Sequence, residues 1–500
     1  MHRLALTFMR YCSGSASQAD IVKELPSIAT RLRQTVAALN TGASPKPISV
    51  PDPPKFLANI RLYGTILENK TASLVKAVRL SYSSSSRLLR TSELLDHLLA
   101  YPAAGEIALD HGLLPTLLRH RERSTVPDHR QKVDQCLALV GYTFPRRSRG
   151  LRVLAIDGGG TRGMIALEVL EAMERECLRL DPSRKCLADF FDFAVGTSTG
   201  AIIASLLVHF QWGVADCKQA YKQISTSLFT RGRWEAVASL VRSHAYYNSA
   251  QWSQILRRVM GERARMVEVA PGGPRLCVVA CLVNARTLTP FLFRNYRTAA
   301  GRPSHFPGDD CCAFIWQALQ ASSAAPYYFQ EVSLGAQLLQ DGGVLVNNPS
   351  AIAVHECKQL WPDEPIQCLV SVGCGARPTL SVAPELSHPQ AAGGASSSLQ
   401  QKLGRILDSA TDTELTHLCL HDLLPAGTYF RLDPFVSELF SLDEVAPEKL
   451  ELMRSDARMY VRRNRPKVEA AARALAALGG RGPRRKAADL ATHWRDRIGW

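Results

Sequence analysis

Three glycine-rich turns, each placed directly after a run of apolar residues, constrain the fold of this chain most strongly. They are Asp157-Gly158-Gly159-Gly160-Thr161-Arg162-Gly163 after Leu151–Ile156, Gly196-Thr197-Ser198-Thr199-Gly200 after Phe191–Val195, and Asp341-Gly342-Gly343 after Leu338–Gln340. A serine on a sharp turn, a turn rich in backbone N–H groups and an acid on a third turn are the parts that acyl hydrolysis needs. Together the three turns predict a hydrolase.

Beyond residue 150, short apolar runs of strand type alternate with helical stretches. This alternation predicts an α/β fold with a largely parallel central sheet, which we assign to residues 151–452 with a motif core at 154–349. The expected elements are Leu151–Ile156, Met164–Arg179, Phe191–Val195, Thr199–Val208, Leu276–Leu282, Leu338–Gln340, Pro349–Leu360 and Ile366–Val372.

Residues 20–150 are predicted to form an α-helical region. Its short amphipathic segments, separated by proline and glycine, resemble one or two armadillo/HEAT-type units. We favour a helical cap on the following domain over a surface for partner docking or membrane contact. The expected helices are Ile21–Leu39, Leu88–Leu99, Ala104–His111, Leu113–Arg121 and His129–Val140.

Positive charge is concentrated at the two ends of the chain. The formal net charge is +15, and basic residues outnumber acids both in residues 1–150 and in 453–500, which we read as a basic helical tail. The excess is either solvated surface charge or a means of holding a near-neutral middle against anionic lipid. Nucleic acid is a poorer partner, because the basic segments lack interleaved aromatics. No run of about 18 apolar residues occurs, so any membrane contact is expected to be peripheral.

Residues 1–19 contain Arg3, Arg10 and several serines, with no acid before Asp20. That composition is typical of a mitochondrial transit peptide, although many disordered N-termini share it. The protein is therefore expected inside the cell, with the mitochondrion as its location. The 13 cysteines are dilute and form no C-x-x-C pair, so we expect no zinc site, and we expect no cofactor.

Ser198 is the expected nucleophile. It lies between an apolar strand and an apolar helix, which is the setting of a nucleophile elbow. Asp341, at the end of a predicted strand, is the expected base. The alternative is a triad that uses His355, but His355 falls inside the predicted helix Pro349–Leu360, and we favour the dyad.

The first glycine-rich turn also fits a dinucleotide-binding turn. Glu174 and Glu176 lie near the distance at which an acid would bind ribose, yet both fall within a predicted helix rather than at a second strand end. In acyl hydrolysis the same turn would present backbone N–H groups to an oxyanion at a helix N-terminus.

The three turns, in this order and spacing, resemble those of the patatin-like phospholipase family. Further stretches are similar to the calcium-independent phospholipases A2 of the gamma type, and the resemblance covers roughly residues 150–470. These stretches are Ser243–Tyr247, Ala321–Pro326, Asn347–Ser350, His355–Lys358 and Ser409–Glu414.

The resemblance implies a three-layer fold and a catalytic Ser198–Asp341 dyad. It implies an oxyanion hole at Gly159, Gly160 and Thr161 with Arg162 close by. It also implies A2- or A1-type hydrolysis of membrane glycerophospholipid esters without calcium, and no EF-hand loop is visible in the sequence. Two alternatives stay open: a nucleotide-binding oxidoreductase, and a catalytically silent lipid-binding scaffold.

The sequence departs from the gamma type in two places. It ends at Trp500 without the Ser-Lys-Leu signal, so peroxisomal import by that route is not expected. Cys374 stands where the family usually has threonine, and we expect little effect from it.

Overall fold

The computed structural model describes residues 53–144, 148–229, 247–268, 273–297, 304–376, 413–438 and 440–477, with side chains from residue 64. The expected targeting segment 1–19, the expected helix Ile21–Leu39 and the tail beyond residue 477 lie outside the described residues. The chain divides into two compact units between Thr116 and Leu117, and each is described by itself.

The first unit is helical, as the sequence predicts. It consists of α3 (Pro53–Arg79), α4 (Ser84–Ala100) and α5 (Ala104–Asp110), and α6 (Leu113–Arg123) crosses into the second unit. The side chain of Ser83 caps α4 by accepting from the N–H of Ser86. A buried hydrogen bond of 2.9 Å between Thr71 Oγ1 and His97 Nε2 joins α3 to α4. The armadillo/HEAT character of this region remains a prediction.

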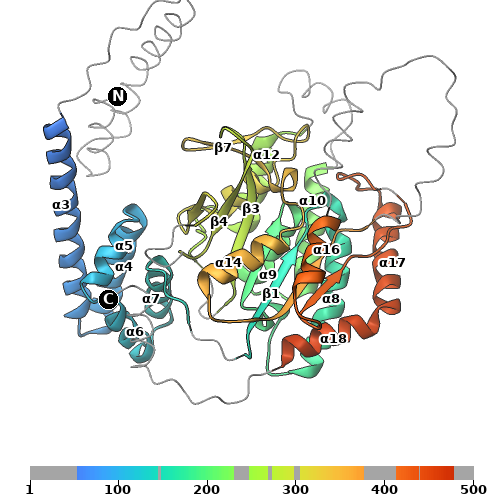
Figure 1. The fold of residues 1–500 in the computed structure, drawn as a ribbon, viewed down its shortest axis with the longest axis horizontal. Coiled ribbons are helices and arrows are strands. Elements are labelled where there is room, and N and C mark those ends of the chain that lie inside the picture. The colour runs from blue at the N-terminus through green and yellow to red at the C-terminus, as the bar shows by residue number, and fades with distance from the viewer. Residues whose placement is uncertain are drawn as a thin grey trace, which may run out of the picture. The chain divides into compact units, whose positions relative to one another are not determined.

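The second unit is built on one mixed sheet in which most neighbouring strands are parallel (Figure 1). The strand order is β5-β4-β3-β2-β1-β8-β9, with β7 paired to β3 and β6 paired to β7. The predicted α/β fold is thus confirmed. The strands are β1 (Leu151–Ile156), β2 (Phe193–Thr197), β3 (Arg275–Leu282), β4 (Thr289–Arg294), β5 (Gly308–Asp310), β6 (Val332–Leu334), β7 (Gln337–Asp341), β8 (Ile366–Val372) and β9 (Tyr429–Leu432).

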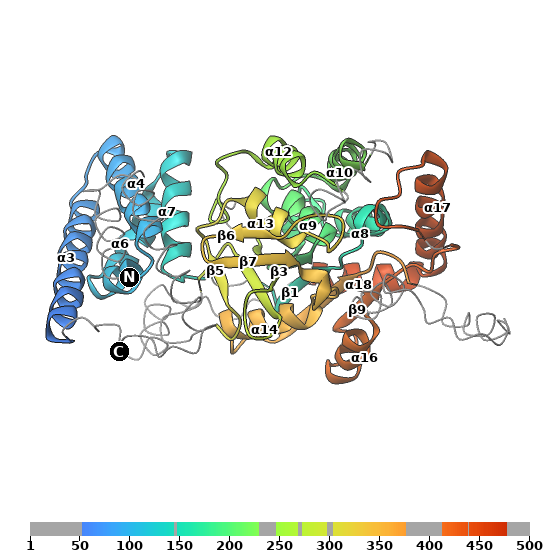
Figure 2. The ribbon, with the colours of Figure 1, turned by 90° about the horizontal axis from the view of Figure 1, so that it is seen from above.

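Helices cover both faces of the sheet, because the central strands are apolar on both sides. In β1, Leu154 and Ile156 pack into one core with α8, α9 and α10, whereas Val153 and Ala155 pack into the other with α14. Figure 2 shows α14 and α16 on the side of the sheet opposite to α9 and α12. The helices are α7 (Pro127–Leu139), α8 (Gly163–Leu180), α9 (Thr199–His209), α10 (Val214–Phe229), α12 (Ser249–Met260), α13 (Ile315–Ser322), α14 (Ser350–Leu360) and α16 (Glu414–Leu423).

Two expected domain boundaries differ from this division. The first unit ends at Thr116 rather than at residue 150. Helix α17 (Pro447–Arg463) runs across the expected boundary at 452, and α18 (Arg465–Ala476) places Val468 and Leu475 in the main core. Residues 453–476 therefore belong to the folded α/β unit, with their basic side chains on its outside.

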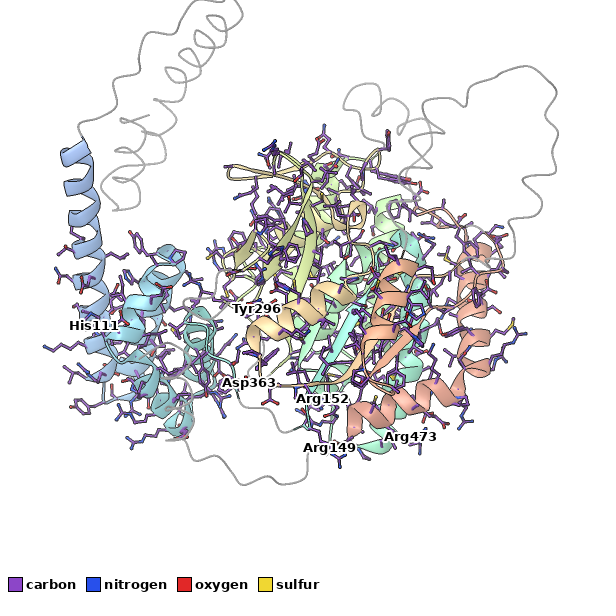
Figure 3. The ribbon with its side chains drawn as sticks, in the orientation of Figure 1. His111, Arg149, Arg152, Tyr296, Asp363 and Arg473 are labelled. Carbon is purple, nitrogen blue, oxygen red and sulfur yellow. The ribbon has the colours of Figure 1, made fainter. Side chains whose placement is uncertain are left out.

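The amino-terminal end of the central strands is closed by a buried ion pair. Arg152 donates from Nη2 to Asp192 Oδ1 at 3.1 Å and from Nε to Asp192 Oδ2 at 3.1 Å. The Arg152 N–H also donates to Asp192 Oδ2 at 3.0 Å. Arg152 is labelled at this end of the sheet in Figure 3. The three glycine-rich turns all lie at the other end.

Candidate active site

Strands β2 and β7 meet end to end against the same edge of β3. Thr197, the last residue of β2, pairs with Val279 of β3, and Asp341, the last residue of β7, pairs with the next residue, Ala280. Because β2 runs parallel and β7 antiparallel to β3, their carboxyl ends face each other. Ser198 follows Thr197 directly, so this seam brings Ser198 to Asp341.

Ser198 occupies a backbone conformation that L-residues rarely adopt, with φ 51° and ψ −120°. Its N–H donates to Ser322 Oγ at 2.9 Å, and that hydroxyl donates to Val279 O at 2.6 Å. Helix α9 begins at the next residue, Thr199. Such a conformation costs about 1–3 kcal/mol and persists only where the surroundings hold it. The expected nucleophile therefore lies on the strained strand-to-helix turn that the sequence predicts.

Glycines flank Ser198 because this turn passes very close to backbone. A Cβ on Gly196 would lie 2.3 Å from the carbonyl carbon of Gly200, and one on Gly200 would lie 2.2 Å from Ile156 O. No side chain fits at either position. Both glycines of the second motif are therefore required for close packing, Gly196 against Gly200 and Gly200 against the end of β1.

The Ser198 hydroxyl donates to Asp341 Oδ2 at 2.7 Å. The other carboxylate oxygen of Asp341 accepts from the N–H of Gly343, also at 2.7 Å. Burial raises the pKa of Asp341 to about 6, and the hydrogen bonds from Ser198 and Gly343 oppose the rise. A carboxylate with that pKa is mostly ionised at neutral pH and is still basic enough to take a proton.

The glycine-rich turn before α8 is anchored on several sides. Gly158 donates its N–H to Asn347 O at 3.2 Å. The carbonyl of Gly160 accepts from Tyr221 OH at 2.5 Å and from Thr199 Oγ1 at 2.8 Å. These contacts hold the turn against α9 and α10, beside Ser198.

Two amides of this turn are left available. Among the residues that the structure describes, the N–H groups of Gly159 and Gly160 have no hydrogen-bond acceptor, and both residues line the same cavity as Ser198. The N–H of Thr161 donates to Leu442 O at 2.7 Å, and Thr161 does not line the cavity. Of the expected oxyanion-hole residues, Gly159 and Gly160 therefore have amides that are available at the cavity, whereas the Thr161 amide is engaged.

Arg162 lines the cavity beside this turn, and its Nε donates to Gly159 O at 3.1 Å. Gly160 has φ +56°, and a Cβ there would lie 2.1 Å from Leu442 O. Only glycine satisfies both restrictions.

A cavity of about 460 Å³ opens at Ser198 and Asp341. Apart from the glycine-rich turn and the Ser198–Asp341 pair, its lining is mostly apolar, which suits a hydrocarbon chain. The apolar residues come from α9, α10, α12, the loop before β6 and the segment before α17: Ile202, Ile224, Leu228, Phe229, Trp252, Phe329, Phe440 and Leu442.

The alternative base does not lie in this cavity. His355 is on α14, where its ring contacts His305 and Phe306, and it is not a lining residue. No histidine of the described part of the chain lines the cavity. The geometry therefore favours the dyad over the triad.

The acids considered for ribose binding have structural partners instead. Glu174 accepts from the N–H groups of Leu187 and Val214, at 3.1 and 3.0 Å from its two carboxylate oxygens. Glu176 pairs with Arg179 at 2.9 Å. Both engagements argue against a dinucleotide site at the glycine-rich turn.

Sequence reasoning missed several residues that support the site. Ser322 lies in the Ala321–Pro326 stretch noted above, so that motif could have identified it. Arg431 lies in the four-residue strand β9 and Asp433 directly after it, and no sequence motif marks either residue. Tyr221 is likewise an unmarked position on an amphipathic helix.

The described residues provide neither a metal-ligand cluster nor a membrane-spanning helix. Within the described ranges, no group of three or more His, Cys, Asp or Glu side chains is placed to hold a metal ion. The described helices also include none that is long and apolar enough to span a bilayer.

Comparisons with known proteins agree with the motifs. Residues 154–354 match the family model for patatin-like phospholipase. Calcium-independent phospholipase A2-gamma of Mus musculus is 39% identical over 414 residues, covering 82% of this chain and 51% of the mouse protein. The Homo sapiens protein of that name is 40% identical over 415 residues, covering 82% and 50%. Phospholipase A I of Arabidopsis thaliana is 30% identical over 293 residues, covering 48% and 22%.

The chain spans about half the length of the gamma relatives that it matches. The matched residues 154–354 include both the glycine-rich turn and the Ser198–Asp341 pair. The resemblance read from the motifs is thereby confirmed, and residues 154–354 of this chain form a patatin-like phospholipase domain.

Proposed function

We propose that this chain is a calcium-independent lipid acyl hydrolase that releases fatty acids from membrane glycerophospholipids. The observation that carries this function is the 2.7 Å hydrogen bond from Ser198 Oγ to Asp341 Oδ2 at the wall of a largely apolar cavity. The names of the gamma relatives, calcium-independent phospholipase A2, support the substrate class.

In the first half of the reaction, Asp341 takes the Ser198 proton while Ser198 Oγ attacks the ester carbonyl carbon. The negative charge that develops on the carbonyl oxygen is stabilised by the amides of Gly159 and Gly160. When the tetrahedral intermediate collapses, the ester C–O bond breaks, and Asp341 returns the proton to the departing lysophospholipid oxygen. Positioned donors of this kind typically contribute about 3 kcal/mol each to transition-state stabilisation.

In the second half, water replaces the lysophospholipid. Asp341 accepts a proton from the water, whose oxygen attacks the acyl-enzyme carbonyl, and the same two amides hold the second oxyanion. Collapse breaks the bond to Ser198 Oγ, which recovers its proton from Asp341. The fatty acid then leaves from the apolar cavity.

We further propose that the cavity mouth contacts the membrane surface. Tyr327 and Leu345 are 43% and 38% exposed, and their chain neighbours Pro326, Tyr328 and Val344 line the cavity. Exposed apolar side chains at such a mouth favour insertion at a lipid interface. The excess of basic residues would add attraction to anionic lipid.

The test is phospholipid hydrolysis by the full chain in excess chelator. Ser198→Ala is expected to lower fatty-acid release by at least about 10⁴-fold, and His355→Ala to leave it within about twofold, because His355 is outside the cavity. A fluorophosphonate is expected to label the parent chain and not Ser198→Ala. Equal fatty-acid release by the parent and Ser198→Ala would support the silent scaffold, and tight NAD binding without labelling would support the oxidoreductase.

The mitochondrial location expected from residues 1–19 is tested separately. Import of the full chain into isolated mitochondria is compared with import of a chain lacking those residues. Unchanged import removes this part of the proposed function and leaves the chemistry untouched.

A further inference from the structure

A buried carboxylate lies directly beside the amides that are proposed to bind an oxyanion. Asp157 is the residue before the glycine-rich turn, it is 1% exposed, and it does not line the cavity. Its N–H donates to Val372 O at 3.0 Å, which joins the end of β1 to the end of β8. A negative charge at this position opposes the formation of a second one at Gly159 and Gly160.

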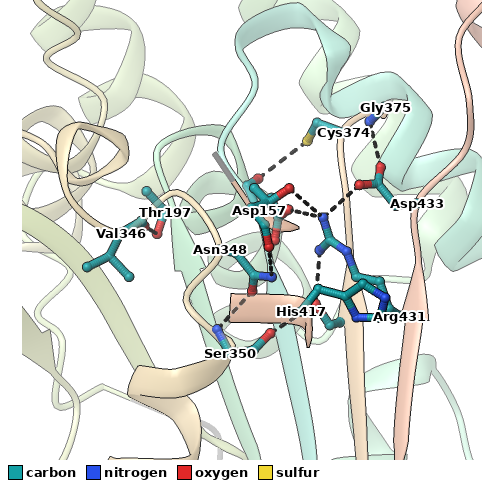
Figure 4. Close-up of polar contacts among 12 residues, drawn as sticks. Asp157, Thr197, Val346, Asn348, Ser350, Cys374, Gly375, His417, Arg431 and Asp433 are labelled. Atoms are coloured by element: carbon teal, nitrogen blue, oxygen red, sulfur yellow. Dashed lines mark hydrogen bonds and ion pairs between the residues drawn. The ribbon is translucent and has the colours of Figure 1, made fainter. Parts of the chain in front are cut away.

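Arg431 reaches this carboxylate from two strands away. It lies on β9, and its Nη2 donates to Asp157 Oδ2 at 2.6 Å and to Asp433 Oδ2 at 2.7 Å. Its Nη1 donates to Ser371 Oγ on β8 at 3.0 Å. The Arg431 and Asp157 side chains are 4% and 2% exposed, so water screens the pair very little. Figure 4 shows the guanidinium between the two carboxylates.

The same cluster also fixes the turn that bounds Gly159 from outside. Asp433 Oδ1 accepts from the N–H of Gly375 at 3.0 Å, and the neighbouring Cys374 Sγ donates to Asp157 O at 3.4 Å. A Cβ on Gly159 would lie 2.4 Å from the Cβ of Cys374. The Arg431 cluster thus pairs the Asp157 carboxylate before the glycine-rich turn and also holds the Cys374 turn that packs against Gly159.

We propose that Arg431 is a positioning residue for the oxyanion site, acting through Asp157 and Asp433. By pairing with Asp157 it neutralises the buried carboxylate that directly precedes the glycine-rich turn, and it fixes the end of β1 from which the Gly159 and Gly160 amides project. Arg431 does not line the cavity, so it acts on the transition state without contacting substrate. This role rests on the proposed function, because it presumes that the two amides bind an oxyanion.

A second buried arginine in the same sheet provides a matched control. Arg294 of β4 donates to Glu356 from Nε at 2.7 Å and to Asp310 from Nη1 at 3.1 Å, and like Arg431 it lies between two carboxylates. Neither Arg294 nor its two partners lines the cavity. The two arginines have similar burial and chemistry and differ in whether they adjoin the glycine-rich turn.

The test compares Arg431→Gln, Arg294→Gln and the double variant Asp157→Asn/Arg431→Gln in the full chain. The kcat values are normalised to the concentration of active sites titrated with a fluorophosphonate, which removes unfolded protein from the comparison, and KM is measured in the same assays. Arg431→Gln is expected to lower kcat about 100-fold with KM within about twofold, comparable to the loss of one oxyanion donor. Adding Asp157→Asn is expected to recover about tenfold, because no unpaired carboxylate remains. Arg294→Gln is expected to keep the parental kcat per titrated site.

A parental kcat in Arg431→Gln overturns the assignment, and so does a loss that Asp157→Asn does not reduce. If Arg431→Gln yields no folded protein, Arg431→Lys is used, with an expected loss of about tenfold. Amide hydrogen exchange over residues 154–164 is an additional readout that needs no activity. Faster exchange in Arg431→Gln than in Arg294→Gln is expected, and equal exchange overturns the role. A parent chain without hydrolysis or labelling refutes the proposed function alone, and the exchange result still decides the positioning.

Discussion

Each end of the central sheet holds a buried aspartate, but the two carboxylates have different hydrogen-bond partners. At the amino-terminal end, Asp192 accepts three hydrogen bonds from Arg152. At the carboxyl end, Asp341 accepts one hydrogen bond from a side chain, that of Ser198, and one from the Gly343 amide. One buried carboxylate is neutralised by a cation, and the other is held by two neutral donors.

The difference between the two carboxylates indicates that the reactive groups gather at the carboxyl end of the sheet, where pairing is incomplete. A buried carboxylate without a cation prefers to be protonated, which is why the pKa of Asp341 is raised to about 6. The same end of the sheet holds the strained backbone of Ser198 and the two amides for which the described residues provide no acceptor. Under the proposed function, this incomplete pairing costs stability and supplies a base, a nucleophile and a binding site for negative charge.

Among the variants that test this comparison, the largest expected effect comes from removing the proposed base. Asp341→Asn keeps the size and the hydrogen-bonding oxygen of the side chain but cannot take a proton at neutral pH. We expect kcat to fall about 10³-fold, within the range of general-base contributions, with the fold retained. Fatty-acid release and circular dichroism are the measurements. A loss of less than tenfold would show that another group acts as the base, and the two carboxylates would then not differ in function.

The next effect tests the two amides. Gly160→Ala puts a Cβ against Leu442 O at a position with φ +56°, so the turn must move. We expect kcat to fall about 100-fold, with KM changed much less, since the displaced amides stabilise the transition state. Gly261→Ala is the control, because Gly261 also has positive φ, at 89°, and at the end of α12 it does not line the cavity. Equal kcat losses in the two variants would show that backbone strain, not the oxyanion site, is responsible.

The pH dependence gives a smaller and graded effect. Since only the ionised carboxylate accepts a proton, kcat/KM is expected to fall about tenfold per unit as pH drops below about 6, the pKa of Asp341. The stability follows the opposite direction. The folded pKa lies above the ordinary value of 3.8, so the fold prefers the protonated acid, and stability decreases as pH rises between these values.

Hydrolysis of a soluble short-chain ester and the Tm of the protein, both from about pH 4 to pH 8, measure the two trends. Asp341→Asn lacks the titrating group, so its Tm is expected not to show the decrease that ionisation of Asp341 causes in the parent. Its Tm is therefore expected to exceed the parental Tm at pH 7. A kcat/KM that stays level down to pH 4.5 would contradict the raised pKa.

The smallest catalytic effect is expected at the opposite end of the sheet. Arg152→Met leaves Asp192 buried without its cation, which typically costs about 3–5 kcal/mol of unfolding free energy. Because this pair is remote from Ser198, kcat per titrated active site is expected to stay within twofold of the parent. Urea unfolding and active-site titration measure the two quantities. A large loss of kcat without a loss of stability would mean that the two ends do not have separate tasks.

Much of this fold follows from the sequence because strands and turns are local. The predicted strands Leu151–Ile156 and Ile366–Val372 coincide with β1 and β8, and α4, α5 and α6 lie within four residues of their expected ends, whereas α3 corresponds to no expected helix. Ser198 and Asp341 were recognisable because glycine motifs mark sharp turns after strands, and the structure brings the two side chains together.

What the sequence did not predict depends on contacts between distant residues. Nothing local indicates that β2 and β7 meet end to end on β3, or that Arg431 reaches across β8 to Asp157. Helix α18 was a different case. Val468, Ala471, Ala472 and Leu475 have helical spacing and are buried, but the surrounding basic residues led to its interpretation as a tail.

The end-to-end seam of β2 and β7 also has a consequence for the timing of synthesis. Asp341 follows Ser198 by 143 residues, so the ribosome completes the nucleophile long before the base. At roughly 5–20 residues per second, about 7 to 29 seconds separate the two. During that interval the growing chain carries Ser198 without Asp341. Under the proposed function, hydrolysis therefore begins only after β7 has paired with β3.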